Sequence, residues 1–281
     1  MKKTKLANDY QNEGVITMNI DQLDQEVKSW FPEIKALIQE NTSYKTKEKR
    51  DFRDLATEID IAVQELIENH IKQLPGHQTI IGEETYGQTE VDPEASHLWI
   101  IDPIDGTANF VKQKENYATM ITYFSHGQAK LAYVYDVFGD ELYSASLGDG
   151  VYCNGKRLEP VADLSLRDSL IGISPQHNIK RDYFYYIADN AFDIRNYGCS
   201  SLDGISVIKG QYGAFVNPGG GPWDYAPFIL MAQEMGLHFS NFSNQIPDYT
   251  KPSNFIIASP ACFSELEPLI QSYTDTGNYN I

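Results

Sequence analysis

The stretch WIIDPIDGTANF, residues 99–110, ends a short apolar run with two carboxylates, Asp102 and Asp105, three positions apart. The run Leu98–Ile101 is predicted to form a buried strand, and sites in α/β proteins form where the chain leaves such a strand. Two close carboxylates repel each other, so a hard cation shared by both is the economical arrangement. The following Gly106 and Thr107 would open a helix whose free N–H groups suit a phosphate. By itself, this spacing is more often a capping aspartate beside a surface aspartate.

Three further acidic positions favour a metal site over a capping aspartate beside a surface aspartate. Glu83 directly follows the apolar run Thr79–Ile81, and Asp60 lies in the first turn of a predicted helix. Asp224 follows a glycine run in GGGPWDYA, residues 219–226, where Trp-Asp opens an apolar helix. Each residue alone has an ordinary explanation as a turn acid, a first-turn acid or a helix cap. Together, in this order, they indicate one shared acidic site.

The composition limits the ligands that such a site can attract. The 281 residues carry 39 acidic and 22 basic side chains, a formal net charge of −17. This surface repels nucleic acid and anionic lipid, and it also repels phosphorylated metabolites. An anionic ligand therefore requires bound cations that invert the local potential. The sequence predicts no nucleic-acid partner.

The sequence also suggests a cellular setting. No apolar run approaches the roughly 20 residues of a membrane span, so no membrane association is expected. Residues 1–17 look like a polar leader, because they lack the apolar core of a signal peptide. The odd number of widely spaced cysteines fits neither a disulfide framework nor a metal motif, so a reducing cytoplasm is predicted. They are Cys153, Cys199 and Cys262.

Periodicity predicts two halves with a boundary near residues 155–165. In 18–155, a helix over residues 19–40 is expected to kink or break at Pro32, and a second helix spans about 58–74. The closely spaced apolar runs that follow predict an antiparallel meander. These runs are 79–81, 98–101, 117–124, 130–137 and 141–146. In 156–281, strands alternate with helices, which indicates a layered α/β arrangement. The strands are predicted at 170–174, 213–216 and 255–258, and the helices at 202–209, 223–235 and 262–273.

The motifs resemble those of the inositol monophosphatase family of lithium-sensitive, metal-dependent phosphatases. The resemblance runs from about residue 20 over nearly the whole chain. It rests on WIIDPIDGTANF and GGPWDYA, with GEE at 82–84 and DLATEID at 54–60 upstream. It implies an α+β / α/β fold, the layered αβαβα sandwich of the sugar-phosphatase type, and a homodimer.

The resemblance also implies a cofactor, two or three Mg²⁺ ions per site, and a mechanism. Direct hydrolysis of a phosphomonoester is implied, by attack of a metal-activated water that Glu83 and Thr107 orient with Asp60 behind them. The phosphate would lie against Asp105, Gly106, Thr107 and Asp224. The implied metal ligands are Glu83, Asp102, the Ile104 carbonyl, Asp105 and Asp224, with Asp60 holding a weaker third ion through water.

Substrate contacts follow less directly from the resemblance. Asn196–Ser201 aligns with a family segment that touches the sugar or polyol, so Gly198 and Ser200 are predicted contacts. Seven residues before Asp224, inositol-specific members carry a glutamate that binds ring hydroxyls. Asn217 stands at that position here, which puts strict inositol specificity in doubt. A basic loop at residues 45–53 matches a mobile flap of the family.

Several alternatives are open to test. A haloacid-dehalogenase nucleophile needs its two acids one residue closer together. A cysteine phosphatase needs Arg six residues after Cys, where this chain has Glu159, Ile205 and Pro268. The same chemistry could act on NADP(H), fructose 1,6-bisphosphate or a nucleotide 3′-phosphate instead of inositol monophosphate. A metal-binding homologue without activity is the remaining possibility.

Overall fold

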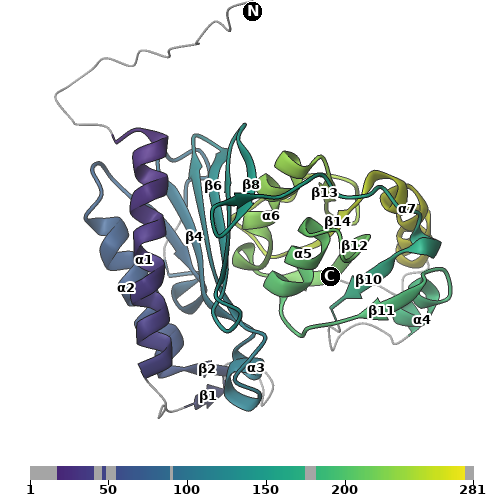
Figure 1. Cartoon of the computed structure of the whole chain (residues 1–281), viewed down its shortest axis with the longest axis horizontal. Helices are drawn as coiled ribbons and strands as arrows, with labels where there is room; N and C mark the ends of the chain where they lie inside the picture. Colours follow the sequence, from purple (N-terminus) through teal and green to yellow (C-terminus); the bar gives the residue numbers. More distant parts are fainter. Residues whose placement is uncertain (1–17, 41–45, 49–54, 89–90, 175–181, 276–281) are drawn as a thin grey trace, which may run out of the picture.

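Two β-sheets lie face to face, with helices between them and on both outer faces (Figure 1). The computed structural model describes residues 18–40, 46–48, 55–88, 91–174 and 182–275. The predicted polar leader, residues 1–17, lies outside them, as does most of the predicted basic loop 45–53. The order of layers is helix, sheet, helix, sheet, helix. The predicted αβαβα sandwich is therefore confirmed.

The larger sheet has seven strands in the order β3-β4-β5-β6-β7-β8-β9. Its strands are β3 Thr79–Gly82, β4 Leu98–Asp105, β5 Ala118–Ser125, β6 Gln128–Asp136, β7 Glu141–Ser146, β8 Gly150–Cys153 and β9 Lys156–Arg157. From β4 onward the pairing is antiparallel, as predicted. The first pair is different, because β3 and β4 run parallel. Because they are parallel, both strands end at the same edge of the sheet.

Two helices cover the outer face of this sheet, α1 Ile20–Glu40 and α2 Glu58–Lys72. Pro32 was predicted to kink or break the first helix. The predicted break is wrong, because α1 continues through Pro32. Trp30, Phe31 and Ile34 around it are buried, while Pro32 is exposed. Burial of this apolar face outweighs one lost backbone hydrogen bond, and water can solvate the freed carbonyl.

The middle layer consists of α5 Ser200–Ile208 and α6 Pro222–Met235. Side chains of both helices belong to one apolar core with the inner faces of the two sheets. This core includes Ile205, Phe228 and Phe255. Because α5 and α6 each begin at the edge where β4 ends, the core fixes their N-termini near the proposed acidic site.

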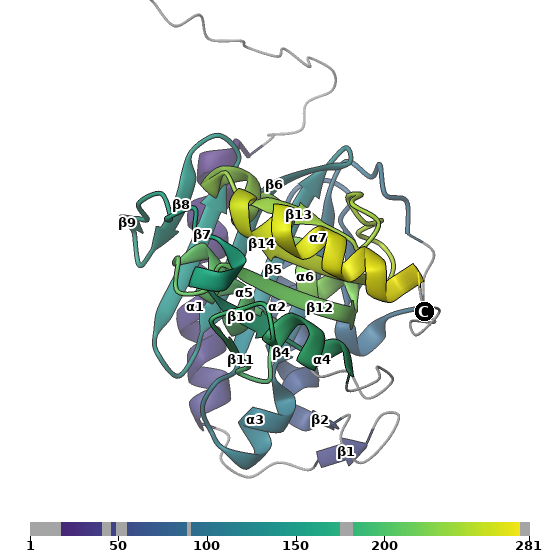
Figure 2. The same ribbon diagram turned by 90° about the vertical axis from the view of Figure 1, so that its right-hand side faces the viewer.

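The smaller sheet has five strands in the order β11-β10-β12-β14-β13. Its strands are β10 Leu170–Ile173, β11 Asp193–Arg195, β12 Ala214–Gly220, β13 His238–Ser240 and β14 Ser253–Ala258. The helices α4 Asp182–Ala188 and α7 Pro260–Asp275 cover its outer face (Figure 2). The remaining elements are β1 Thr46–Glu48, β2 Leu55–Thr57, α3 Thr107–Lys112 and the 3-10 turns Glu83–Thr85 and Leu166–Asp168.

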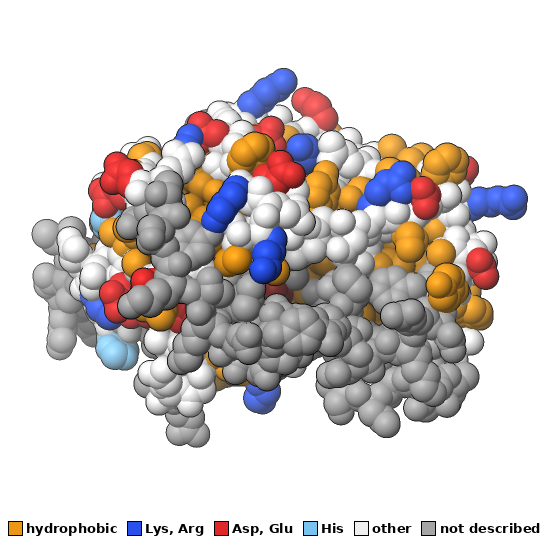
Figure 3. All heavy atoms as spheres, turned by 90° about the horizontal axis from the view of Figure 1, so that it is seen from below, with side chains coloured by type: hydrophobic (Ala, Val, Ile, Leu, Met, Phe, Trp, Pro, Cys, Tyr) orange, Lys and Arg blue, Asp and Glu red, His pale blue; other side chains and the backbone are white. Residues whose placement is uncertain are grey.

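Charged side chains of both signs are interspersed on the face shown in Figure 3. Lysine and arginine side chains lie singly there among acidic and hydrophobic ones, as far as the described atoms show. No helix in the described ranges has the length and apolarity that crossing a membrane requires. The three cysteines, all within the described part, carry free thiols.

Candidate active site

A pocket of about 650 Å³ opens where β4 ends, between the two sheets and the start of α6. It is lined by Glu83, Tyr86, Asp102, Ile104, Asp105, Gly106, Thr107, Pro218, Gly219, Gly220, Gly221, Trp223, Asp224, Pro252, Ser253 and Asn254. These residues come from four stretches that are distant in sequence. Most of the residues singled out from the motifs therefore meet in one place.

A β-bulge at the end of β4 lets Asp102 and Asp105 line the same pocket. In a regular strand, residues three apart point to opposite faces of the sheet. Here Asp102 pairs with Met120 and Asp105 with Ala118, so three steps on β4 match two on β5. The one extra residue turns the second carboxylate back to the face of the first. The Thr119 hydroxyl stabilises the bulge by donating to the Pro103 carbonyl at 2.8 Å.

Asp224 reaches the pocket from the first turn of α6. Its Oδ2 accepts a hydrogen bond from the Gly221 N–H at 2.6 Å, the reciprocal contact of a capping interaction. This contact fixes the side chain against the loop that closes the pocket. The N-cap of α6 is Gly221, so Asp224 is the third residue of the helix and not its cap, and it lines the pocket.

The three aspartates form a compact oxygen cluster. One carboxylate oxygen from each of Asp102, Asp105 and Asp224 lies within 4.8 Å of the others. Two opposite oxygens on Mg²⁺ are about 4.2 Å apart, and on Ca²⁺ about 5 Å apart. Asp102 Oδ1 is buried and has no hydrogen-bond partner among the described residues. A buried carboxylate oxygen without a donor fits a cation ligand, and the all-oxygen set is the one that hard divalent cations prefer.

The cluster is electrostatically unfavourable without a cation. Burial raises the pKa of Asp102 well above its ordinary value, and the nearby carboxyls of Glu83 and Asp105 raise it further. Burial, followed by Asp105 and Glu83, raises the pKa of Asp224 to about 8. Both shifts favour the protonated carboxyls, so a divalent cation would compete with protons for this cluster.

Asp105 is stabilised differently, by backbone donors at the N-terminus of α5. The Ser201 N–H donates to Asp105 Oδ2 at 2.5 Å, and the Ser200 and Gly106 N–H groups also bond this carboxyl. Burial raises the pKa of Asp105, and these donors oppose that shift. The Gly106 N–H, predicted to hold phosphate, is thus already engaged by Asp105.

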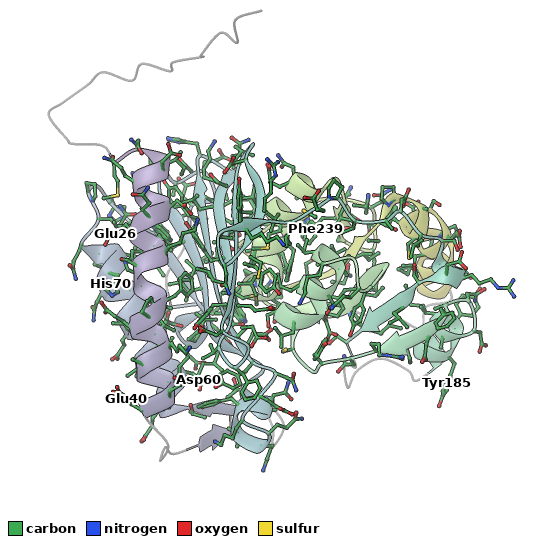
Figure 4. All side chains as sticks on the ribbon, in the orientation of Figure 1. Glu26, Glu40, Asp60, His70, Tyr185 and Phe239 are labelled. Carbon is green, nitrogen blue, oxygen red and sulfur yellow. The ribbon has the colours of Figure 1, made fainter. Side chains whose placement is uncertain are left out.

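Asp60 lies behind the pocket and reaches it through Thr107. Figure 4 labels Asp60 at the end of α2 nearest α3. The Thr107 hydroxyl lies 2.9 Å from Asp60 Oδ1 and 3.0 Å from the Ile104 carbonyl oxygen. The other oxygen of Asp60 accepts from the Thr57 N–H at 2.9 Å and from the Thr57 hydroxyl. The Thr107 hydroxyl can donate to either acceptor, which leaves its lone pairs for a hydrogen atom of a water.

The predicted residues fall into two groups. Lining the pocket are Glu83, Asp102, Ile104, Asp105, Gly106, Thr107 and Asp224. The predicted substrate contacts Gly198, Ser200 and Asn217 are not among the lining residues. Gly198 is exposed on the surface, and Ser200 and Asn217 are buried.

Sequence reasoning missed four residues in and around the pocket. Tyr86 and Trp223 line it, with ring centroids 5.0 Å apart in an edge-to-face arrangement. Trp223 belongs to the motif at 219–226 and Tyr86 lies two residues after the motif at 82–84, and these positions were the available signals. Ser201, whose N–H bonds Asp105, ends the segment Asn196–Ser201 but was assigned no role. The buried Asp203 had no sequence signal, because an aspartate early in a helix usually faces water.

The fold and the acidic pocket together define a phosphatase of the layered αβαβα class. The model of the inositol monophosphatase family matches residues 19–275. The chain belongs to the inositol monophosphatase family, whose members are phosphatases, as the motifs predicted.

Individual relatives agree with this assignment. Inositol-1-monophosphatase of Bacillus subtilis is 29% identical over 251 residues, covering 86% of this chain and 94% of its own. Nus factor SuhB of Pseudomonas aeruginosa is 31% identical over 234 residues, with coverages of 80% and 86%.

Solved structures give the same result. An IMPase/NADP phosphatase in complex with NADP and Ca²⁺ superposes with a TM-score of 0.86 at 33% identity, covering 90% of this chain and 96% of that one. A staphylococcal inositol monophosphatase-1 soaked in LiCl superposes with the same TM-score and identity, with coverages of 90% and 95%.

Proposed function

We propose that this chain is a Mg²⁺-dependent phosphomonoesterase that hydrolyses a small phosphorylated metabolite of the inositol monophosphate type. The observation that carries the proposal is the cluster of Asp102, Asp105 and Asp224, whose carboxylate oxygens lie within 4.8 Å of one another. The buried Oδ1 of Asp102, which has no hydrogen-bond partner in the described part of the chain, supports a cation at this position. Structures of relatives with Mg²⁺ and phosphate, and with Ca²⁺, also support it.

The residues that would hold cations are Glu83, Asp102, the Ile104 carbonyl, Asp105 and Asp224, with Asp60 contributing through water. When bound, divalent cations supply positive charge for the phosphoryl oxygens and lower the pKa of a water. We propose that two or three cations bind in each site. Their charge would offset the repulsion between the acidic pocket and a phosphate dianion.

The side chains of this protein would position the reactants. Thr107, held by Asp60, would accept a hydrogen bond from the attacking water, and Glu83 would accept its proton. The scissile phosphate would lie against Asp105, Thr107 and Asp224, with the Thr107 N–H as a backbone donor. Displacement in line at phosphorus needs no covalent intermediate with the protein.

A second candidate substrate is NADP(H). Tyr86 and Trp223 line the pocket beside the acidic cluster, and their aromatic faces could stack on a planar base. One of the structural relatives is described as an IMPase/NADP phosphatase bound to NADP.

A substrate panel tests these proposals. Phosphate release would be measured with inositol 1-phosphate, NADP, fructose 1,6-bisphosphate and 3′-phosphoadenosine 5′-phosphate, in Mg²⁺ and in excess EDTA. We expect turnover only with Mg²⁺, and inhibition by millimolar Li⁺. Activity that persists in EDTA would contradict the metal mechanism, and no release from any ester would favour a metal-binding protein without activity. A homodimer and a cytoplasmic location stay predictions, which light scattering and fractionation would test.

A further inference from the structure

We propose that Ser200 and Asn217 are positioning residues that orient the Asp224 carboxylate, instead of contacting the substrate. This inference rests on the proposed function, because it assigns Asp224 to a cation. It concerns a chain of hydrogen bonds that begins in strand β12, passes through the N-terminus of α5 and ends on the first turn of α6.

Burial is the first reason. Asn217 is 1% exposed and Ser200 is 7% exposed, and neither lines the pocket. A substrate hydroxyl could reach them only if the surrounding loop moved. Buried polar side chains need internal partners, since an unpaired one costs about 1–3 kcal/mol. The structure supplies such partners for both residues.

The direction of the hydrogen bonds is the second reason. The Gly219 N–H donates to Asn217 Oδ1 at 3.0 Å, which turns the amide so that its NH₂ group faces Ser200. Asn217 Nδ2 then donates to the Ser200 hydroxyl oxygen at 3.0 Å. Because that oxygen acts as an acceptor, its own hydrogen is available to donate, and the Asp224 carboxyl lies beside it as an acceptor.

The position of Asp224 is the third reason. Its Oδ2 accepts the Gly221 N–H at 2.6 Å, and the Ser200 side chain adjoins the same carboxyl as a second donor. The remaining lone pairs are available toward Asp102 and Asp105. The register of β12 shifts between Asn217 and Gly220, so Asn217 also anchors the loop that lines the pocket.

A substrate-contacting role and a positioning role have different effects on specificity. A side chain that contacts the polyol affects only substrates that have one. A side chain that orients Asp224 affects every phosphomonoester equally, together with cation binding. Asn217 would therefore affect the turnover of every phosphomonoester and would not discriminate between their alcohol groups.

The test compares Asn217→Ala and Ser200→Ala with the wild type on two substrates, inositol 1-phosphate and para-nitrophenyl phosphate, which has no polyol. Mg²⁺ affinity would be measured separately by titration calorimetry. We expect kcat/KM to fall by the same factor on both substrates, about 10–100-fold, and Mg²⁺ affinity to weaken. The double variant should be no worse than either single one, because both act through one chain of contacts.

Two further variants test the donor role of the Asn217 amide and provide a matched control. Asn217→Asp has the same shape but cannot donate to Ser200, so it should impair Mg²⁺ binding at least as much as Asn217→Ala. Ser206→Ala is the matched control, a buried serine on the same helix whose hydroxyl bonds the Leu202 carbonyl at 2.8 Å. It should leave Mg²⁺ affinity unchanged.

A substrate role would give a different result. If kcat/KM fell more than 10-fold for inositol 1-phosphate alone, with Mg²⁺ affinity intact, Asn217 and Ser200 would be polyol contacts and the inference would be wrong. A wild type without phosphatase activity would overturn the proposed function instead. In that case the Mg²⁺ titrations alone would decide the inference.

Discussion

The Thr107 hydroxyl lies 2.9 Å from Asp60 Oδ1, which joins the start of α3 to the start of α2 across 47 positions of sequence. The contact holds a hydroxyl at the edge of the acidic pocket with its lone pairs directed by two fixed acceptors. Thr107→Val removes that hydroxyl and keeps the shape. We expect kcat to fall about 10²–10³-fold, because one positioned hydrogen bond to the attacking water is lost.

Thr107→Ser is the control for this change, since it retains the hydroxyl. It should keep kcat within about 10-fold of the wild type. Steady-state phosphate release under saturating Mg²⁺ measures both variants. A loss in the serine variant as large as that in the valine variant would show that the missing hydroxyl does not by itself explain the effect.

Asp102→Asn should separate activity from stability. Phosphate release should fall about 100-fold or more, because a ligand of the proposed cation is lost. In EDTA at pH 8, however, the free energy of unfolding should rise, since a buried carboxyl in a repulsive cluster is replaced by a neutral amide. Urea unfolding with and without Mg²⁺ would measure this. A variant that is less stable than the wild type in EDTA would contradict the repulsion.

Cation binding should stabilise the wild type strongly. A ligand at 100 times its dissociation constant adds about 2.7 kcal/mol to the free energy of unfolding when only the native state binds it. We expect Mg²⁺ to raise the melting temperature of the wild type, and to raise that of Asp102→Asn much less. The same rise in both proteins would place the cation elsewhere.

Asp203 should make the metal-free protein less stable as the pH rises. It is 1% exposed, and burial, with a further contribution from Asp105, raises its pKa from 3.8 to about 7. Because the folded state binds this proton more tightly than the unfolded state, the stabilisation is complete below pH 4. It is lost as the pH rises to about 7, and amounts to at most about 4 kcal/mol.

Asp203→Asn removes this titration and should flatten the dependence of stability on pH between 4 and 7. Asp189→Asn, at an exposed position, is the control and should leave the dependence unchanged. Urea unfolding in EDTA at several pH values gives the result. The same slope in Asp203→Asn and the wild type would show that Asp203 does not titrate in this range.

Gly106 has a backbone conformation that other residues rarely adopt, with φ of 87°. A Cβ there would lie 2.9 Å from the Cβ of Cys199 and 3.0 Å from the Asn116 carbonyl oxygen. Gly106→Ala should therefore destabilise the protein by about 2–4 kcal/mol. Gly148→Ala is a matched control, with φ of 81° and no atom within 4 Å of the added carbon, and should cost only about 1 kcal/mol. Thermal unfolding of both variants would show how much of the destabilisation comes from the close contacts with Cys199 and Asn116. Equal destabilisation of the two variants would show that these contacts contribute nothing.

The sequence by itself predicted an acidic, oxygen-lined site and most of the elements. Glu83, Asp102, Asp105 and Asp224 follow apolar runs or open an apolar helix, so their local positions could be derived from periodicity and turn residues. The motifs at 99–110 and 219–226 then identified the family. These signals depend only on residues that are close in the sequence, so they can be recognised without the structure.

Only the tertiary structure decided how these residues meet. The bulge that brings Asp105 to the side of Asp102 depends on pairing with β5, and the parallel pairing of β3 with β4 depends on a crossover. The continuity of α1 through Pro32 depends on apolar burial against the sheet. The burial of Ser200, Asp203 and Asn217 depends on α5 packing between the two sheets. Each of these features depends on contacts between segments that are far apart in the chain. Their stabilising free energy comes from residues that a local sequence pattern cannot identify.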